Sequence, residues 1–555
     1  MAEGGTNLPI VKLDKTRLEQ EVGEDIDLIL EKIPMIGADI ERINPKEVDI
    51  EFFPNRPDLF NDIGVSRALK GFLDIEKGAP VYNTETSNHG LEVTKDVQPV
   101  RPEIVGAVVK DLKLSEKDIE SLVELQEHLH WGLGRDRKKV SIGLHDLKDI
   151  NFPFKYTAVE PSSTEFTPLG FNEEMDLSEI LKKHEKGKKY GKILKEKSRY
   201  PILKDKDDKI LSFPPIINGV TTEVDEKTSN IFIDVTGTDR DSIEDALNIL
   251  VTSLSDIGGK IYDLQIHGVY NRKTPELDHK TYNVDIKDIK ELLGFKATKD
   301  EIKDSLKKMR FGAEINGENV KVNVPPYRAD ILHPHDIIED VAIGYGYQNL
   351  KPRKPNIPGV GSSHDIEETG KQLREIMTGL GYLEVMTLTL TNEKNEYINL
   401  NREIKESVEI ENPITEEHTI LRNTLLPSLL EILKLNQHRE LPQRIFEYGE
   451  VIHPTKEFAK DCYHLSGISI HSNANFSEMK SVINAIFREI NIDYELSKSD
   501  DKSFIKGRRA EIKHKNKKIG IFGEIHPKVL QNHDLVHPAA GFEIEANKLT
   551  NEINN

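Results

Sequence analysis

Apolar residues recur at strand and helix spacing along most of the chain, and polar stretches rich in proline and glycine divide this pattern into four parts. We expect a small α/β domain over 1–82, a domain of alternating strands and helices over 83–268, a module of helices and a hairpin over 269–350, and a helix-and-sheet domain over 355–555. The predicted fold class is therefore α+β with several domains.

The first part begins with MAEGGTNL, which carries no pattern and which we interpret as a flexible leader. A short strand (IVKL), a helix from Asp14, a second apolar-periodic run (DIDLILEKI), a strand at VDIEFFP and a helix over 59–73 follow. Residues 83–98 are polar and lack periodicity, so we interpret them as a linker.

The second part alternates strands with helices. Its helix candidates are 115–134 and 241–258. Its strand candidates are 104–112, 139–147, 154–161, 215–224 and 230–237. A mixed sheet with a few packed helices is the economical fold for this order of elements.

The third part predicts two short amphipathic helices followed by a hairpin. Thr298 with Glu301 three residues later is a capping box for the second helix. Asn316 and Gly317 are typical of a two-residue hairpin turn. This order resembles a winged-helix module, which binds nucleic acid or protein.

The last part opens with an amphipathic helix over 364–381 and a strand over 382–391. Strands and shorter helices follow to the end of the chain. This pattern predicts an antiparallel sheet with helices.

Four carboxylates gather between Pro325 and Tyr347, and they are Asp330, Asp336, Glu339 and Asp340. The last three are spaced i, i+3, i+4, so they lie on one face of a helix that begins near Pro334. A set of oxygen ligands without His or Cys suits a hard cation such as Mg²⁺. The alternative is that first-turn acids offset the helix dipole, with Asp336 and Glu339 as a capping pair.

Two apolar strands, ILSFPPIINGV and IFIDVTGTD, end in small polar side chains that converge near Gly237, namely Ser212, Asn218, Asp234, Thr236 and Thr238. Hydroxyls beside a carboxylate could bind the polar atoms of an amino acid or position a water molecule. Alternatively, DVTGTD is a strand end followed by a helix cap at Asp239 or Asp241.

The formal charge of −20 argues against a protein that coats nucleic acid with its whole surface. Residues 182–209 depart from this balance with twelve Lys or Arg against five Asp or Glu, so they form either a phosphate-binding stretch or a solvated loop. The single cysteine, Cys462, excludes an internal disulfide. No apolar run approaches the roughly 18 residues of a membrane span, and we expect a cytoplasmic protein without membrane contact.

Several longer motifs occur in a fixed order: FFPNRPDLFNDIGVSRALKGFL, KVSIGLHDL, FPPIIN with DVTGTD, VPPYRADILHPHDIIEDVAIGYGY, NPITEEHTILRNTLLPSLL with RIFEYGEVI, and GEIHPKVL. Together they resemble the β chains of archaeal phenylalanyl-tRNA synthetases from residue 9 onward. The resemblance implies a class II aminoacyl-tRNA synthetase assembled as an α₂β₂ tetramer. In that family the α chain uses ATP to join phenylalanine to its tRNA, and the β chain carries a catalytic-like domain without the active centre.

The arginine content of the last part agrees with this expectation. Class II catalysis uses an arginine after the final core strand to hold the ATP phosphates. This role suits arginine, because its guanidinium group is permanently charged and can donate two parallel hydrogen bonds. No arginine follows Arg509 in this chain. We therefore expect no catalytic residue for aminoacylation here.

The resemblance also implies two sites. The first is an editing pocket in the second part, which hydrolyses tyrosine wrongly attached to tRNA(Phe) and whose matching positions are Leu203, Ser212, Asp234 and Thr236. The second is a Mg²⁺ site shared with the α chain on the four carboxylates named above. Two alternatives stay open, a free-standing tRNA deacylase and a winged-helix protein that binds nucleic acid.

Overall fold

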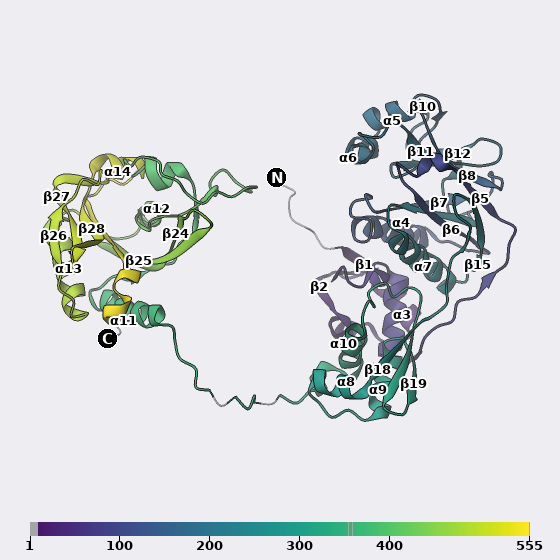
Figure 1. The fold of residues 1–555 in the computed structure, drawn as a ribbon, viewed down its shortest axis with the longest axis horizontal. Helices are drawn as coiled ribbons and strands as arrows, with labels where there is room; N and C mark the ends of the chain where they lie inside the picture. The colour runs from purple at the N-terminus through teal and green to yellow at the C-terminus, as the bar shows by residue number, and fades with distance from the viewer. Residues whose placement is uncertain (1–8, 353, 358, 554–555) are drawn as a thin grey trace. The chain divides into compact units, whose positions relative to one another are not determined.

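The computed structural model describes residues 9–352, 354–357 and 359–553. The chain separates into two compact units, one up to Lys354 and one from Pro355 (Figure 1). The division agrees with the Pro- and Gly-rich stretch that separates the third and fourth parts of the sequence. The predicted leader at 1–8 lies outside the described residues.

The first part holds a three-stranded antiparallel sheet in the order β1-β3-β2. Its elements are β1 (Ile10–Asp14), α1 (Lys15–Val22), α2 (Ile26–Lys32), β2 (Ala38–Ile43), β3 (Glu47–Phe52) and α3 (Asp62–Phe72). Asp14 caps α1 and Asn61 caps α3, each accepting a backbone N–H. The sequence did not predict β2, because only the first of its six residues is buried.

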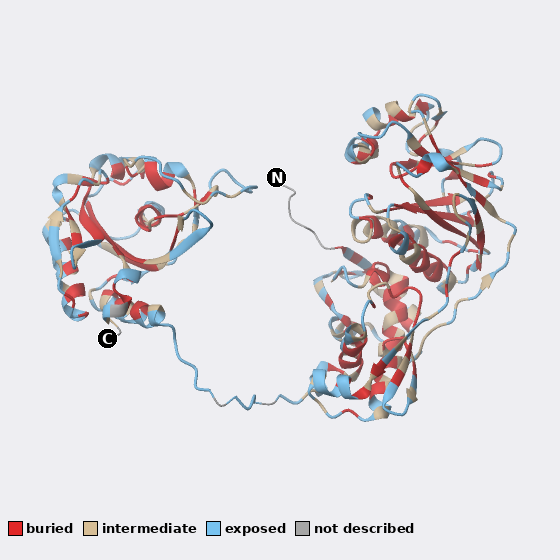
Figure 2. Cartoon of the chain, viewed as in Figure 1, coloured by how far each residue is buried: buried red, intermediate tan, exposed pale blue. Residues whose placement is uncertain are grey.

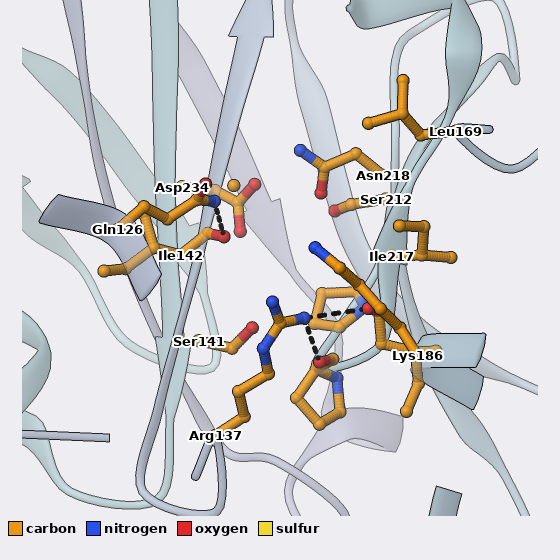
Figure 3. Close-up of a pocket in the computed structure, with 14 residues that line it drawn as sticks. Gln126, Arg137, Ser141, Ile142, Leu169, Lys186, Ser212, Ile217, Asn218 and Asp234 are labelled. Atoms are coloured by element: carbon orange, nitrogen blue, oxygen red, sulfur yellow. Dashed lines mark hydrogen bonds between the residues drawn. The ribbon is translucent and has the colours of Figure 1, made fainter. Parts of the chain in front are cut away.

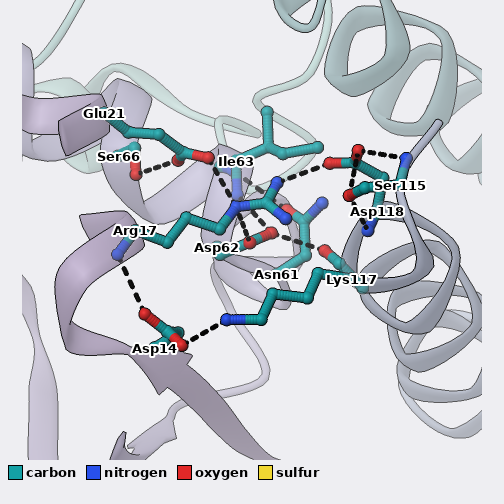
Figure 4. A network of polar contacts seen from close by, with 12 residues as sticks. Asp14, Arg17, Glu21, Asn61, Asp62, Ile63, Ser66, Ser115, Lys117 and Asp118 are labelled. Atoms are coloured by element: carbon teal, nitrogen blue, oxygen red, sulfur yellow. Dashed lines mark hydrogen bonds and ion pairs between the residues drawn. The ribbon is translucent and has the colours of Figure 1, made fainter. Parts of the chain in front are cut away.

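Arg17 joins this part to the next one (Figure 4). Its guanidinium contacts Glu21 at 2.6 Å, Asp62 at 2.9 Å and Asp118 at 2.8 Å. These carboxylates belong to α1, α3 and α4 (Glu116–Trp131), so one side chain ties three helices together. All three pairs are mostly buried, which weakens their screening by solvent.

The second part is built from two sheets packed face to face. The five-stranded sheet has the order β4-β15-β6-β14-β7 and the seven-stranded sheet the order β13-β12-β11-β8-β5-β16-β17. The strands of the first sheet are β4 (Thr84–Glu85), β6 (Glu103–Lys110), β7 (Val140–Asp146), β14 (Ile231–Gly237) and β15 (Lys260–Tyr262). Those of the second are β5 (Gly90–Val93), β8 (Phe154–Val159), β11 (Tyr200–Lys204), β12 (Ile210–Phe213), β13 (Ile217–Asn218), β16 (Leu264–Gly268) and β17 (Arg272–Thr274).

Because side chains alternate along β14, its two faces pack against two different cores. Ile231, Ile233 and Val235 pack into the core formed with α4 and α7 (Arg240–Asp256). Phe232 packs into the core between the two sheets. Asp234 and Thr236 share the face of Phe232 and are buried, so both polar side chains point toward the second sheet.

Two predictions in this part were wrong. The interpretation of 83–98 as a linker fails because β5 lies inside the seven-stranded sheet, parallel to both β8 and β16. Only Leu91 and Val93 are buried on this strand, too few for a periodic signal. The strand predicted over 215–224 is short, since β13 ends at Asn218 and a 3₁₀ turn follows over Val220–Thr222.

The third part places a three-stranded antiparallel sheet, β18-β20-β19, against three helices. Its elements are β18 (Lys280–Asp285), α8 (Ile286–Leu293), α9 (Lys299–Lys308), β19 (Gly312–Asn316), β20 (Asn319–Val324) and α10 (Pro334–Tyr345). The capping box of Thr298 and Glu301 is confirmed. The two-residue turn is Gly317 and Glu318, one residue later than predicted, because Asn316 still pairs with Asn319. Gly317 has a φ of 64°, which explains the glycine at this position.

The unit from Pro355 onward contains a seven-stranded sheet, β21-β24-β25-β29-β28-β27-β26, antiparallel except where β21 pairs with β24. Its strands are β21 (Leu383–Glu384), β24 (Gln443–Pro454), β25 (Ala459–Ile470), β26 (Glu495–Lys498), β27 (Phe504–His514), β28 (Lys517–Ile525) and β29 (Ala539–Glu545). The helices α11 (Asp365–Gly379) and α13 (Phe476–Glu489) pack on one core, and α12 (Leu426–Leu435) and α14 (Pro527–Asn532) on another.

The predicted antiparallel sheet and first helix of this unit are confirmed, and Figure 2 shows its buried strands in red. The strand predicted over 382–391 is mostly wrong, because only β21 and β22 (Leu390–Thr391) are paired. Across the residues that the structure describes, no helix combines the length and apolar character that a membrane span requires.

Candidate functional site

A cavity of about 60 Å³ lies in the second part, where the edge of one sheet faces the edge of the other. Strands β7 and β14 form one wall, and strands β12 and β13 form the opposite wall (Figure 3). Its polar lining residues are Gln126, Arg137, Ser141, Lys186, Ser212, Asn218 and Asp234.

Asp234 is the carboxylate of this cavity. Its side chain is 2% exposed, and its Oδ1 lies 2.6 Å from Nε2 of His145. Within the described residues, no hydrogen bond reaches the other carboxylate oxygen, Oδ2. A carboxylate oxygen that lines a cavity and has no donor is an acceptor that a bound molecule could satisfy.

Ser212 and Asn218 face Asp234 from the opposite wall (Figure 3). The Ser212 hydroxyl is buried and has no hydrogen-bond partner. The Asn218 side-chain amide donates to the carbonyl of Leu144 at 3.2 Å, which holds its orientation. The structure therefore brings together three of the polar residues that the sequence singled out.

The other predicted pocket residues lie beside the cavity. Leu203 is directly opposite Ser212 in the β11–β12 ladder and is fully buried in the core between the sheets. Thr236 accepts a hydrogen bond from Arg101 Nε at 3.0 Å and is also fully buried. Thr238 is exposed. Asp239 caps α7, so the helix-cap alternative is correct for this residue.

Two cations also line the cavity. Arg137 donates to the carbonyl of Ile216 at 2.9 Å and to Glu127 at 2.8 Å. Lys186, whose side chain is 42% exposed, contacts the same Glu127 oxygen at 3.3 Å. Lys186 belongs to the lysine-rich segment, in which the exposed Lys182, Lys188, Lys192 and Lys195 have no ion-pair partner among the described residues.

The predicted metal ligands are arranged around an arginine. Arg328 is 3% exposed and binds Asp330 through Nε at 2.8 Å and Nη2 at 2.7 Å. The same Nη2 contacts Asp340 at 2.6 Å. Burial raises the pKa of Asp340 to about 6, because the positive charges of Arg328 and Arg56 compensate the desolvation incompletely.

Asp336 and Glu339 lie apart from this pair. Asp336 accepts the backbone N–H groups of Leu332 and His333 at 2.8 and 2.7 Å and so caps α10. Its capping partner is His333, and the predicted pairing with Glu339 is wrong. Glu339 is exposed. Over 9–352, 354–357 and 359–553, no three His, Cys, Asp or Glu side chains come close enough to hold a metal, so the four carboxylates do not fit Mg²⁺ as they lie.

Three protein-family models match successive parts of this chain. The B3/4 domain matches residues 93–253, the tRNA synthetase B5 domain 282–347, and the phenylalanyl tRNA synthetase beta chain CLM domain 350–546. The phenylalanine–tRNA ligase beta subunit of Archaeoglobus fulgidus is 47% identical over 97% of this chain and 98% of its own length. The chain belongs to the phenylalanine–tRNA ligase β-subunit family.

Further members of this family agree. The beta subunit of Methanosarcina acetivorans is 46% identical over 98% of this chain and 99% of its own length. The crystal structure of an N-terminal fragment of the phenylalanyl-tRNA synthetase beta subunit from Pyrococcus horikoshii is 38% identical, with a TM-score of 0.59, and covers 61% of this chain and 99% of that fragment. The expectation that this chain is a subunit of a tRNA ligase is confirmed.

Three arginines in the last domain of this ligase subunit bind other protein groups. Arg422 contacts Glu447 at 2.8 Å, and Arg402 contacts Asp501 at 2.9 Å. Arg509 donates to the carbonyl of Ser499 at 2.8 Å. No arginine follows β29 in the sequence.

His145, Gln126 and Arg137 were not among the residues predicted from the sequence. A signal for His145 was present, because Ser141, Gly143 and His145 alternate along a predicted strand and must share one face. Polar and small residues on one face of an otherwise apolar buried strand point to a site. Gln126 and Arg137 lie on a helix and a loop, where no such periodicity marks them.

Proposed function

We propose that this chain is the β subunit of an α₂β₂ phenylalanine–tRNA ligase and that its second domain hydrolyses tyrosine wrongly attached to tRNA(Phe). The pairing of Asp234 with Ser212 carries the proposal. The Ser212 hydroxyl is buried and unpaired, and Asp234 lines the same cavity, in a domain separate from the C-terminal sheet. Leu203 and Thr236 support the two walls.

The chemistry suits discrimination between two similar amino acids. Tyrosine differs from phenylalanine by one hydroxyl, and an unpaired buried acceptor binds the hydroxyl but is left unsatisfied by a phenyl ring. Water then adds to the ester carbonyl carbon, the bond from that carbon to the ribose oxygen breaks, and the ribose oxygen takes a proton. The products are tyrosine and tRNA with its terminal hydroxyl restored.

The aminoacylation reaction, with ATP as substrate, belongs to the α chain in this proposal. Two arginines of the C-terminal unit support this division, because Arg402 and Arg422 are already paired with carboxylates of the same unit. Exposed apolar side chains on the same unit support a protein partner, since Met386 is 94% exposed, Leu388 64% and Ile414 89%. The class II relationship of this unit and the winged-helix relationship of the third part stay predictions.

The lysine-rich segment is our candidate for contact with tRNA. Its helices α5 (Leu177–Lys183) and α6 (Glu185–Tyr190) carry exposed lysines, and Lys186 reaches the cavity itself. Unpaired lysines in a chain with a charge of −20 make a local surface that attracts phosphates. The tRNA 3′ end would approach the cavity from this side. A Mg²⁺ ion shared with the α chain stays a prediction.

Coexpression with the α chain tests the proposal. We expect an α₂β₂ assembly by sizing, phenylalanine-dependent pyrophosphate exchange by the complex and none by this chain alone, and hydrolysis of Tyr-tRNA(Phe) by the complex. Strong exchange by this chain alone would overturn the division of labour. A stable monomer that hydrolyses Tyr-tRNA(Phe) and never copurifies with a smaller partner would favour the free-standing deacylase.

A further inference from the structure

Three contacts hold the His145 side chain in place. It lies on β7, is fully buried, and its Nε2 is 2.6 Å from Asp234 Oδ1. Its Nδ1 is 2.8 Å from the hydroxyl of Thr222. The ring also stacks on Phe232, with 5.8 Å between ring centroids and 24° between planes. Both nitrogens and one ring face are therefore engaged.

The direction of the hydrogen bond between His145 and Asp234 follows from simple chemistry. An ionised carboxylate only accepts, so Nε2 carries the hydrogen and donates it to Oδ1. The Thr222 hydroxyl, which also lies 3.2 Å from the carbonyl of Gly219, meets the opposite nitrogen. Thr222 thus orients the ring while His145 orients the carboxylate.

Gly143 leaves the space for this pair. It stands directly opposite Asp234 in the β7–β14 ladder. A Cβ on Gly143 would lie 2.2 Å from Asp234 Oδ1 and 2.7 Å from His145 Nε2. Any larger residue would therefore displace the carboxylate or the ring. Gly143 and His145 are two residues apart and therefore lie on the same face of β7, next to Asp234.

We propose that His145 is the positioning residue of the cavity, acting through Asp234. It binds Oδ1 and thereby turns Oδ2 toward the substrate. Asp234 lines the cavity, whereas His145 and Thr222 do not. A Thr–His–Asp chain resembles a nucleophilic triad, but Thr222 is 1% exposed and outside the cavity, so it takes no part in bond making. The inference rests on the proposed editing function.

The test compares His145→Leu with His145→Gln in the α₂β₂ complex. Leucine removes the donor, whereas glutamine places an amide N–H where Nε2 stands. We expect His145→Leu to reduce hydrolysis of Tyr-tRNA(Phe) about 10- to 100-fold and His145→Gln to restore most of it. Phenylalanine charging should stay unchanged in both variants. His533→Gln is the matched control, because His533 is also a buried histidine but lies in the C-terminal unit.

Rescue by glutamine separates positioning from general destabilisation. A purely structural role would lower hydrolysis in both variants, because neither side chain replaces the packed imidazole ring. Wild-type hydrolysis by His145→Leu, or a loss that His145→Gln does not restore, would overturn the inference.

Failure of the editing proposal gives a different result. In that case the wild-type complex itself does not hydrolyse Tyr-tRNA(Phe). Crystal structures of the full-length variants then still test the positioning. We expect the Asp234 carboxylate to keep its orientation in His145→Gln and to turn in His145→Leu, and in Gly143→Ala as a second variant. An unmoved carboxylate in both His145→Leu and Gly143→Ala would contradict the inference.

Discussion

Arg328 binds Asp330 through two parallel hydrogen bonds of 2.8 and 2.7 Å in the buried centre of the third part. This fork-to-fork geometry is the strongest form of an arginine–carboxylate contact. Burial by itself raises the pKa of Asp330, but the adjacent guanidinium outweighs it and lowers the pKa below its usual value. The cluster is thus compensated from within the chain.

Replacing Arg328 should destabilise the protein strongly. Arg328→Met leaves the mostly buried Asp330 and Asp340 without the cation that hydrogen-bonds to them, which costs about 3–5 kcal/mol. Urea unfolding of the full chain measures the effect. Arg488→Met is the control, since Arg488 is 77% exposed and should change stability little. Equal stabilities of the two variants would show that the buried fork contributes nothing.

Removing Mg²⁺ should leave this chain's thermal midpoint unchanged. Arg328 already supplies the positive charge, and Asp336 caps α10 by accepting backbone N–H groups. Differential scanning fluorimetry in EDTA and in excess Mg²⁺ makes the comparison. A midpoint that falls in EDTA and recovers with Mg²⁺ would show instead that the four carboxylates rearrange around the ion.

Changing the carboxylate of the cavity should separate editing from charging. In the assembled enzyme, Asp234→Ala removes the acceptor that faces Ser212, so Tyr-tRNA(Phe) should accumulate while phenylalanine charging stays intact. Asp239→Asn is the control, because asparagine caps α7 as well as aspartate does. Undiminished hydrolysis by Asp234→Ala would show that Asp234 does not contribute to the editing pocket.

Reversing charges on the lysine-rich segment should weaken tRNA binding for editing. In Lys188→Glu with Lys192→Glu, we expect KM for Tyr-tRNA(Phe) hydrolysis to rise about tenfold, with a weaker dependence on salt. Lys480→Glu with Lys517→Glu changes the charge equally at exposed sites of the C-terminal unit. If both pairs raise KM alike, net charge rather than this segment is responsible.

The buried Glu396 should make the C-terminal unit less stable as the pH rises. Burial raises its pKa from 4.5 to about 7, so the folded state binds more protons than the unfolded state between these values. The free energy of unfolding then falls by about 2–3 kcal/mol across this range. Glu396→Gln keeps an acceptor for Asn423 N–H and should remove this dependence.

Hydrogen exchange of peptides over 420–435, followed by mass spectrometry at pH 5 and pH 8, reports the stability of this region. Glu393→Gln, at an exposed position nearby, should keep the wild-type dependence. A pH dependence that persists in Glu396→Gln would assign the effect to another group.

Local chemistry predicted much of the secondary structure. The capping box of Thr298 and Glu301, the turn at Gly317 and the long helices near 116–131 and 240–256 depend on residues close in sequence. The predictions failed for strands that are stabilised mainly by pairing with other strands. Strand β5 has only two buried residues, and its place between β8 and β16 is set by partners far along the chain.

For the candidate sites, the sequence alone determined the residue types and the face they share: Asp234 and Thr236 on one side of a strand, and Asp336, Glu339 and Asp340 on one helix, α10. Tertiary structure decided their partners. His145 reaches Asp234 only through the β7–β14 register, and Arg328, not a neighbouring carboxylate, meets both Asp330 and Asp340. Side-chain spacing fixes direction within one element, whereas contacts between elements depend on how separate elements pack.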